Sequence, residues 1–118
     1  VLGAVHGDER CGPEAIRRVA AEFADGRRRL VRGSVTLVPV TNVLAYRERR
    51  REGERNLNRG LAPVPAPLVY EDRLANWLCP LLARHDVLVD LPSFRSPGRR
   101  VVMLGPRDND GPLAPFAH

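Results

Sequence analysis

Residues 1–9 read VLGAVHGDE, an apolar run that ends directly in His6, Gly7, Asp8 and Glu9. Such a run is typical of a buried parallel strand, and the polar residues after it would lie at the carboxyl edge of the sheet. Gly7 allows a tight turn there, so that His6 and Glu9 can reach one point. An imidazole and a carboxylate are two of the three protein ligands of a catalytic zinc site. The alternative is a surface histidine followed by acids that favour the start of a helix.

The third ligand of such a site should come from the end of a neighbouring strand. The apolar run at residues 87–91 predicts that strand, but the residue that follows it is Pro92, which cannot bind a metal. Asp90 would share a face with position 92, two residues deeper, and is therefore a conceivable substitute that lies further from the cleft. The sequence thus predicts a metal site that has His6 and Glu9 as ligands and lacks the third at Pro92.

Apolar periodicity divides the rest of the chain into alternating helices and strands. Residues 41–69 interrupt this alternation as a long polar and proline-rich loop, which in a compact domain is usually functional or disordered. Pro80 should kink or divide the second helix. The order of elements predicts an α/β fold with a mostly parallel sheet and ligand chemistry at the carboxyl ends of its strands. The expected elements are strands at 1–5, 34–40, 87–91 and 101–104, and helices at 13–25 and 70–84.

The length of 118 residues allows one domain at most. The chain starts inside an apolar strand and ends in a loop, so we expect residues 1–118 to be a single partial catalytic domain, truncated at both ends. No apolar run approaches ~20 residues, so no transmembrane segment is expected. Cys11 and Cys79 could pair, but without a C-x-x-C spacing, free thiols in a reducing cytoplasm are the favoured interpretation.

All 19 basic residues are arginine, and the net charge of +5 could attract acidic substrates, phosphate or nucleic acid. The arginine-rich run at residues 47–51 raises the alternative of a nucleic-acid-binding module. Against this alternative, Glu48, Glu52 and Glu54 interrupt the basic stretch, and only one Trp, two Tyr and three Phe are available to stack on bases.

Residues 51–59 read REGERNLNR. Arginine side chains bind carboxylates through two parallel hydrogen bonds, and an asparagine amide can orient a carbonyl or carboxylate. Beside a metal ion, this segment would suit an anionic acyl amino acid. The alternative is a solvated loop in which arginine and glutamate alternate.

Together, these motifs resemble the succinylglutamate desuccinylase/aspartoacylase family of zinc-dependent deacylases, which are related to the zinc carboxypeptidases. Residues 6–9 resemble the family's H-G-x-E, whose His and Glu bind zinc and map onto His6 and Glu9. Residues 90–93 resemble its D-L-H-S, whose His is the third zinc ligand and is Pro92 here. Asn42 and Ala45 resemble the N-P-x-A stretch that begins the substrate loop.

Residues 56–59 read NLNR and resemble the family's D-L-N-R, with Asn56 in place of the aspartate. The Asn and Arg of that motif contact substrate, which by resemblance implies that Asn58 and Arg59 do so here. A further substrate arginine, seven residues before the Asn, maps onto Arg51. The family's general base is a glutamate downstream of the stretch that resembles it, so no catalytic residue is assigned within this chain.

The resemblance implies a three-layer, zinc-carboxypeptidase-like α/β fold of which this chain is an N-terminal fragment, with residues 41–69 as the substrate-binding loop. It implies a cytoplasmic hydrolase that binds one zinc ion and cleaves the acyl-amide bond of an N-acyl amino acid or a similar small carboxylate. The substitution at Pro92 predicts impaired metal binding and little activity for this chain. A catalytically dead member that keeps the anion pocket is an alternative, and the arginine-rich nucleic-acid module is a second.

Overall fold

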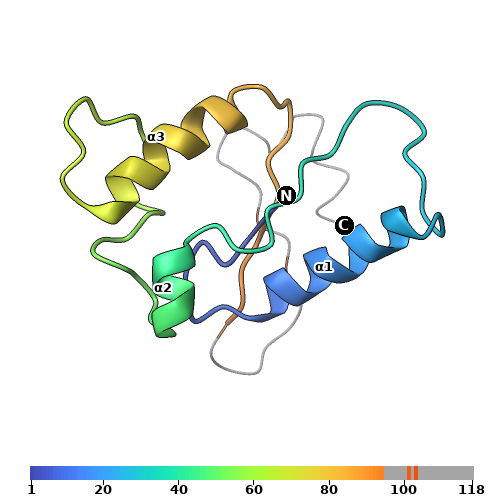
Figure 1. Ribbon diagram of the computed structural model, residues 1–118, viewed down its shortest axis with the longest axis horizontal. Helices are drawn as coiled ribbons and strands as arrows, with labels where there is room; N and C mark the ends of the chain where they lie inside the picture. The colour runs from blue at the N-terminus through green and yellow to red at the C-terminus, as the bar shows by residue number, and fades with distance from the viewer. Residues whose placement is uncertain (95–100, 102, 104–118) are drawn as a thin grey trace.

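The computed structural model describes residues 1–94, 101 and 103. In Figure 1 the strands lie at the centre of the molecule, with α1 and α3 on either side of them. The two strands pair in parallel, with Leu2 opposite Asp90 and Gly3 opposite Leu91. The elements in chain order are β1 (Leu2–Gly3), α1 (Cys11–Ala24), α2 (Val43–Glu48), α3 (Tyr70–Leu82) and β2 (Asp90–Leu91).

The parallel arrangement predicted for residues 1–5, 34–40 and 87–91 is confirmed, but the strands are shorter than predicted. Residues 34–40 contribute a single parallel bridge between Val38 and Leu2. The Gly3 N–H donates to the Val38 carbonyl at 2.9 Å, and the Leu2 N–H donates to the Val89 carbonyl at 2.8 Å. These bonds place β1 between the 34–40 segment and β2. Ala4, with φ of 47°, takes the left-handed conformation directly after Gly3 and so ends β1.

The helices begin and end within a few residues of their predicted limits. α1 begins at Cys11, two residues before the predicted start, and its Ile16 is almost completely buried. α3 ends at Leu82, two residues before the predicted end. Pro80 lies inside α3 without dividing it, so of the two predicted effects, a kink or a division, the division does not occur.

α2 lies inside the 41–69 segment, where we expected no helix. Its first turn is capped by Asn42, whose side-chain oxygen accepts the Ala45 N–H at 3.0 Å. It ends at Arg49, which takes the left-handed conformation with φ of 55°. The helix spans six residues, too few for apolar periodicity to distinguish it from the arginine-rich loop around it.

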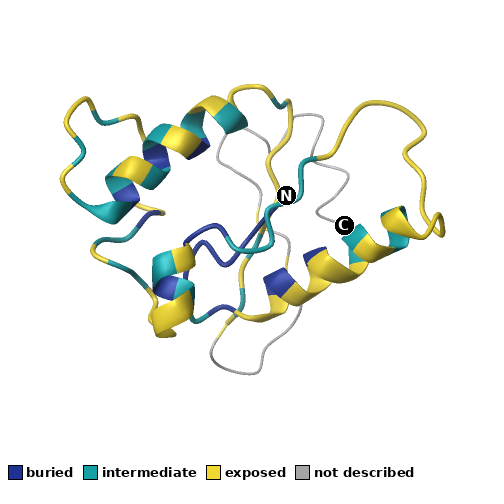
Figure 2. Cartoon of the chain, in the orientation of Figure 1, coloured by how far each residue is buried: buried dark blue, intermediate teal, exposed yellow. Residues whose placement is uncertain are grey.

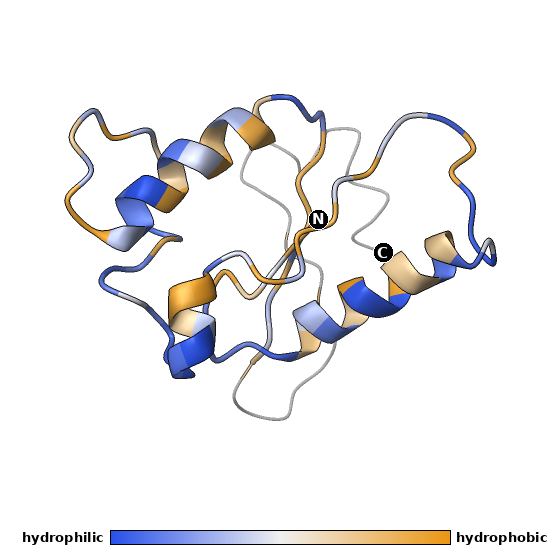
Figure 3. Cartoon of the chain, viewed as in Figure 1, coloured by the Kyte–Doolittle hydropathy of each residue, from blue (hydrophilic) through white to orange (hydrophobic). Residues whose placement is uncertain are grey.

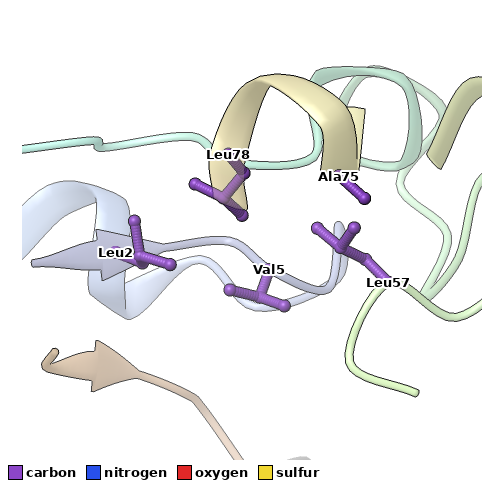
Figure 4. Close-up of a cluster of buried hydrophobic side chains, with 5 residues drawn as sticks. All are labelled: Leu2, Val5, Leu57, Ala75 and Leu78. Carbon is purple, nitrogen blue, oxygen red and sulfur yellow. The ribbon is translucent and has the colours of Figure 1, made fainter. Parts of the chain in front are cut away.

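The core cluster joins β1, α3 and the loop before α3 (Figure 4). Its members are Leu2, Val5, Leu57, Ala75 and Leu78. Figure 2 shows that α3 is buried along one side only. Gly3, the neighbour of Leu2, instead lies close to Gly12 and Ile16 of α1. Because successive residues of a strand face opposite ways, α1 and α3 cover opposite faces of β1. This is an α/β arrangement, and the wider three-layer sheet stays a prediction.

Residues 87–89 form the part of the third predicted strand that precedes β2. Val87, Leu88 and Val89 are 49%, 50% and 43% exposed. Figure 3 shows this segment as hydrophobic, and Figure 2 shows it as exposed. On the edge away from β1, no strand pairs with it among the residues that the structure describes. The fourth strand, predicted at 101–104, includes residues outside the described part and stays a prediction.

Cys11 and Cys79 are both free thiols, the first exposed and the second partly buried. Within the described ranges, every helix is too short or too polar to cross a membrane.

Candidate metal centre

His6 and Glu9 meet in the turn that follows β1. Their side chains are 7% and 8% exposed, and His6 Nδ1 lies 3.0 Å from Glu9 Oε1. The backbone closes the turn, because the Glu9 N–H donates to the His6 carbonyl at 3.2 Å. The structure therefore brings together the imidazole and the carboxylate that the sequence pattern singles out, in a buried position.

Gly7 allows α2 to pack directly on this turn. A Cβ atom at position 7 would lie 2.0 Å from the Ala45 carbonyl carbon and 2.4 Å from the Tyr46 nitrogen, both of which are backbone atoms. The Gly7 N–H also donates to the Arg51 carbonyl at 3.2 Å. Hence the glycine does more than permit a tight turn, since only a residue without a side chain leaves space for the α2 backbone.

Asn56 holds the other side of the His6 ring. Its side-chain oxygen lies 3.2 Å from His6 Nε2 and also accepts the Asn58 N–H at 2.9 Å. With an acceptor fixed at this point, His6 Nε2 is the donor. A neutral His6 then presents the lone pair of Nδ1 to Glu9 Oε1, so two acceptors face each other. A hydrogen bond here needs a proton on one of the two atoms, and a bound cation would satisfy both of them.

The charge on Glu9 is only partly compensated by the protein. Its Oε2 atom is buried and has no hydrogen-bond partner in the described part of the chain. Among the described residues, Arg51 places its Nη1 3.7 Å from Glu9 Oε1, although that arginine side chain is 46% exposed. A buried carboxylate oxygen without a partner is costly, so a cation at this point would stabilise the site.

The end of β2 does not complete a set of three ligands. Across residues 1–94 together with 101 and 103, no group of three His, Cys, Asp or Glu side chains is placed to hold a metal ion. Pro92 is exposed at the position where the third ligand was expected. Asp90 is close enough to be affected electrostatically: desolvation, then repulsion by Glu9, raises the pKa of its carboxyl, while the charge of His6 opposes the shift.

The three predicted substrate residues occupy different places. Arg51 reaches Glu9, as described above, and so lies at the centre. Asn58 and Arg59 are exposed beside Asn56, and their hydrogen bonds stay within the loop. Arg59 Nη1 donates to the Asn58 carbonyl at 2.8 Å, and Arg55 Nη1 donates to the Arg59 carbonyl at 3.1 Å. Asn58 and Arg59 therefore form a polar rim rather than a direct contact with His6.

Glu71 is a residue of this region that the sequence analysis missed. It lies in the first turn of α3 and is completely buried. Burial alone would raise the pKa of its carboxyl, but hydrogen bonds from Asn42 and from the backbone N–H groups of Glu54 and Arg55 outweigh burial and lower that pKa. The signal was its spacing, because positions 71, 75 and 78 share the buried face of α3.

Comparison with models of protein families matches residues 1–91 to the succinylglutamate desuccinylase/aspartoacylase catalytic domain. Searches of curated proteins and of solved structures gave no match. The matched range contains β1, the turn with His6 and Glu9, the 41–69 segment and β2. This chain therefore belongs to the succinylglutamate desuccinylase/aspartoacylase family.

Proposed function

We propose that this chain is a zinc-dependent deacylase domain whose own metal binding and activity are impaired by Pro92. The substrate would be an N-acyl amino acid or a similar small carboxylate, and the bond cleaved would be its acyl amide. Family membership supports a hydrolase of this kind. The observation that carries the proposal is the buried pair of His6 Nδ1 and Glu9 Oε1, 3.0 Å apart, whose atoms are of the type that binds zinc.

The residues present fit a zinc ion as two of its three expected protein ligands. His6 and Glu9 would hold it, and such a cation would satisfy the buried Glu9 Oε2, which has no hydrogen-bond partner among the described residues. When bound, zinc would polarise the substrate carbonyl and lower the pKa of a bound water towards ~7. Asn56 would keep the His6 ring oriented. Arg51, Asn58 and Arg59 would bind the substrate carboxylate through charge-assisted hydrogen bonds.

A second candidate function is anion binding without catalysis. It is favoured by the short distance between Arg51 and Glu9, because this arginine can partly neutralise Glu9 when no metal is bound. The discriminating measurement is calorimetric titration with N-acetyl and N-succinyl amino acids in the presence of a chelator. Saturable binding under these conditions would support the binding-only function, whereas no binding in either metal state would exclude it.

The nucleic-acid alternative loses support from the surface charges. Arg18, Arg27 and Arg28 each form an ion pair with an acid close by in the sequence, at 2.8 Å, 2.7 Å and 2.7 Å. Such pairing reduces the positive charge that is free to meet phosphates. A nucleic-acid-binding module would show affinity for DNA or RNA that falls steeply with salt concentration, and we expect no such binding.

The test of the proposed function compares zinc binding by the natural chain, Pro92→His and Pro92→Ala. Metal analysis gives the stoichiometry, competitive chelation gives the affinity, and circular dichroism shows that all three are folded. We expect Pro92→His to bind one zinc ion at least about 100-fold more tightly than the others, because losing a direct ligand should cost more than disturbing an outer contact.

The Pro92→Ala variant separates the loss of proline from the gain of an imidazole. If it binds zinc as tightly as Pro92→His, another residue such as Asp90 supplies the third ligand. If no folded variant binds zinc, the proposed function is wrong for this chain.

A further inference from the structure

The carboxylate of Glu71 receives four hydrogen bonds in a site that is closed to solvent. Its Oε1 accepts from Asn42 Nδ2 at 2.9 Å and from the Gly53 N–H at 2.9 Å. Its Oε2 accepts from the Glu54 N–H at 3.0 Å and from the Arg55 N–H at 3.2 Å. One side chain of α3 therefore fixes three consecutive backbone amides of the loop and the residue that caps α2.

Only a carboxylate satisfies this set of donors. All four partners are N–H groups, and each carboxylate oxygen accepts two of them. A glutamine in the same place would turn one end of the side chain into an NH₂ group that faces two donors. Gly53 contributes space, because a Cβ atom there would lie 2.3 Å from Glu71 Oε1. The contact therefore depends both on the carboxylate of Glu71 and on the absence of a side chain at Gly53.

The segment that Glu71 fixes leads directly into the metal centre. The residue after Arg55 is Asn56, whose oxygen lies 3.2 Å from His6 Nε2. On the other side, the Asn42 N–H donates to the Ala4 carbonyl at 3.0 Å, two residues before His6. A second bond joins the same loop to α3 in the opposite direction. The Tyr70 N–H at the start of α3 donates to the side-chain carboxylate of Glu54. Asn56 is therefore held against His6 by a chain of contacts that begins at Glu71.

We propose that Glu71 is a positioning residue of the metal centre, which fixes the backbone of residues 53–55 so that Asn56 orients His6 towards Glu9. Glu71 touches neither His6 nor Glu9 through any hydrogen bond found in the described residues, so it acts through Asn56. The inference rests on the proposed zinc site for its affinity readout, but its structural readout does not require metal. Glu71 is at the same time the only completely buried acid of the described residues.

Two variants perturb the contact from opposite sides. Glu71→Gln removes the matching set of acceptors, and Gly53→Ala keeps the carboxylate but pushes a methyl group against it. The matched control is Asn76→Ala. Asn76 also lies on α3 and also holds the backbone of the same loop, through the Val64 N–H at 2.6 Å and the Val64 carbonyl at 2.9 Å. It differs in holding the proline-rich half, which does not contact His6.

The metal-free readout is NMR of the folded full chain. We expect nuclear Overhauser contacts between the His6 ring and the Asn56 amide in the natural chain and in Asn76→Ala. In Glu71→Gln and Gly53→Ala these contacts should disappear, and the Glu54 and Arg55 amides should exchange faster. A role in overall stability alone would not separate these variants from the control. If Glu71→Gln does not fold, Gly53→Ala decides the result.

The second readout is zinc affinity in the Pro92→His background. We expect Glu71→Gln and Gly53→Ala to weaken zinc binding by about 10- to 100-fold, the usual cost of disturbing an outer contact of a zinc ligand. Asn76→Ala should leave the affinity unchanged. Equal zinc affinity in all these variants overturns the positioning role. If Pro92→His binds no zinc at all, the proposed function fails, and the NMR contacts alone decide whether Glu71 positions Asn56.

Discussion

The two strands of this molecule lie side by side in register, yet their carboxyl ends are built differently. After β1, His6 and Glu9 are buried and in contact, and Asn56 holds the outer nitrogen of the ring. At β2, Asp90 within the strand and Pro92 directly after it are exposed, and the position expected for a ligand carries a side chain without a donor atom. The turn after β1 thus has a buried pair of proposed ligands with supporting contacts, whereas position 92 offers no donor atom.

The difference shows that the two strand ends are held by separate sets of contacts. The contacts that support His6 come from α2, from residues 51–56 and, through them, from α3. None of these contacts involves the end of β2. A change at position 92 therefore need not loosen the contacts that hold His6 and Glu9.

Gly7→Ala should have the largest effect on stability, because it disrupts the packing of α2 on the turn that follows β1. The added methyl group would overlap backbone atoms of α2, which cannot move away as a flexible side chain can. We expect a loss of at least about 3 kcal/mol in the free energy of unfolding, at the upper end of the range for overpacking. Urea denaturation followed by circular dichroism measures it.

The matched control for that variant is Gly26→Ala. Position 26 has a φ of 77° and no atom within 4 Å of the added Cβ, so only backbone strain of about 1 kcal/mol is expected. Equal losses at positions 7 and 26 would contradict direct packing of α2 on the turn.

Glu71→Gln should cost about 2 kcal/mol at pH 7, the scale of a hydrogen bond to a buried charge, and the cost should shrink in acid. The pKa of the Glu71 carboxyl is lowered in the folded chain. Its contribution to stability is therefore present above the unfolded-state pKa of about 4.3 and is lost as the pH falls through the lower folded-state value. Urea denaturation of both proteins at pH 7, 5 and 3 tests this. A gap that stays constant or widens in acid would show that the carboxylate is not stabilising.

Asn56→Asp, made in the Pro92→His background, should increase the affinity for zinc at the turn after β1. A carboxylate that accepts from His6 Nε2 makes the imidazole a more basic ligand than an amide does. It also preserves the acceptor for the Asn58 N–H. We expect zinc to bind about tenfold more tightly, measured by competitive chelation. Unchanged or weaker binding would mean that Asn56 does not act through the His6 ring.

Arg51→Gln should have the smallest effect and should act in opposite directions on two ligands. Its guanidinium lies near Glu9 but is partly exposed and therefore screened. Without this charge, zinc should bind about twofold to fivefold more tightly to Pro92→His, and the gain should fade in high salt. Affinity for an N-acyl amino acid should fall in the same variant. A parallel loss of both affinities would argue that Arg51 supports the structure instead.

The parts of the fold that the sequence predicts are those fixed by neighbouring residues. His6 and Glu9 are three positions apart in one turn, so their meeting follows from the local pattern. The helices α1 and α3 follow from apolar periodicity, and parallel pairing follows from the order of elements. The strand lengths were overestimated because apolar runs do not reveal the left-handed turn at Ala4.

The supporting contacts could not be predicted because they join distant parts of the chain. Asn56 is 50 positions from His6, and Asn42 is 29 positions from Glu71. Nothing in the local pattern around Glu71 marks it as buried, since an acid in the first turn of a helix is favourable in solvent as well. Only the spacing with Ala75 and Leu78 places it on the buried face, and that spacing does not name its partners.

The close packing of α2 on Gly7 has a consequence for mutational maps of this chain. A scan that substitutes every position and scores survival should find position 7 as intolerant as position 6, although glycine brings no functional group. Such a map would assign to the functional site some residues whose only role is to leave space for neighbouring backbone atoms. Substitutions at position 7 are expected to fail because the α2 backbone leaves no space for a side chain there. This intolerance should remain in any variant that has lost metal binding but keeps the fold.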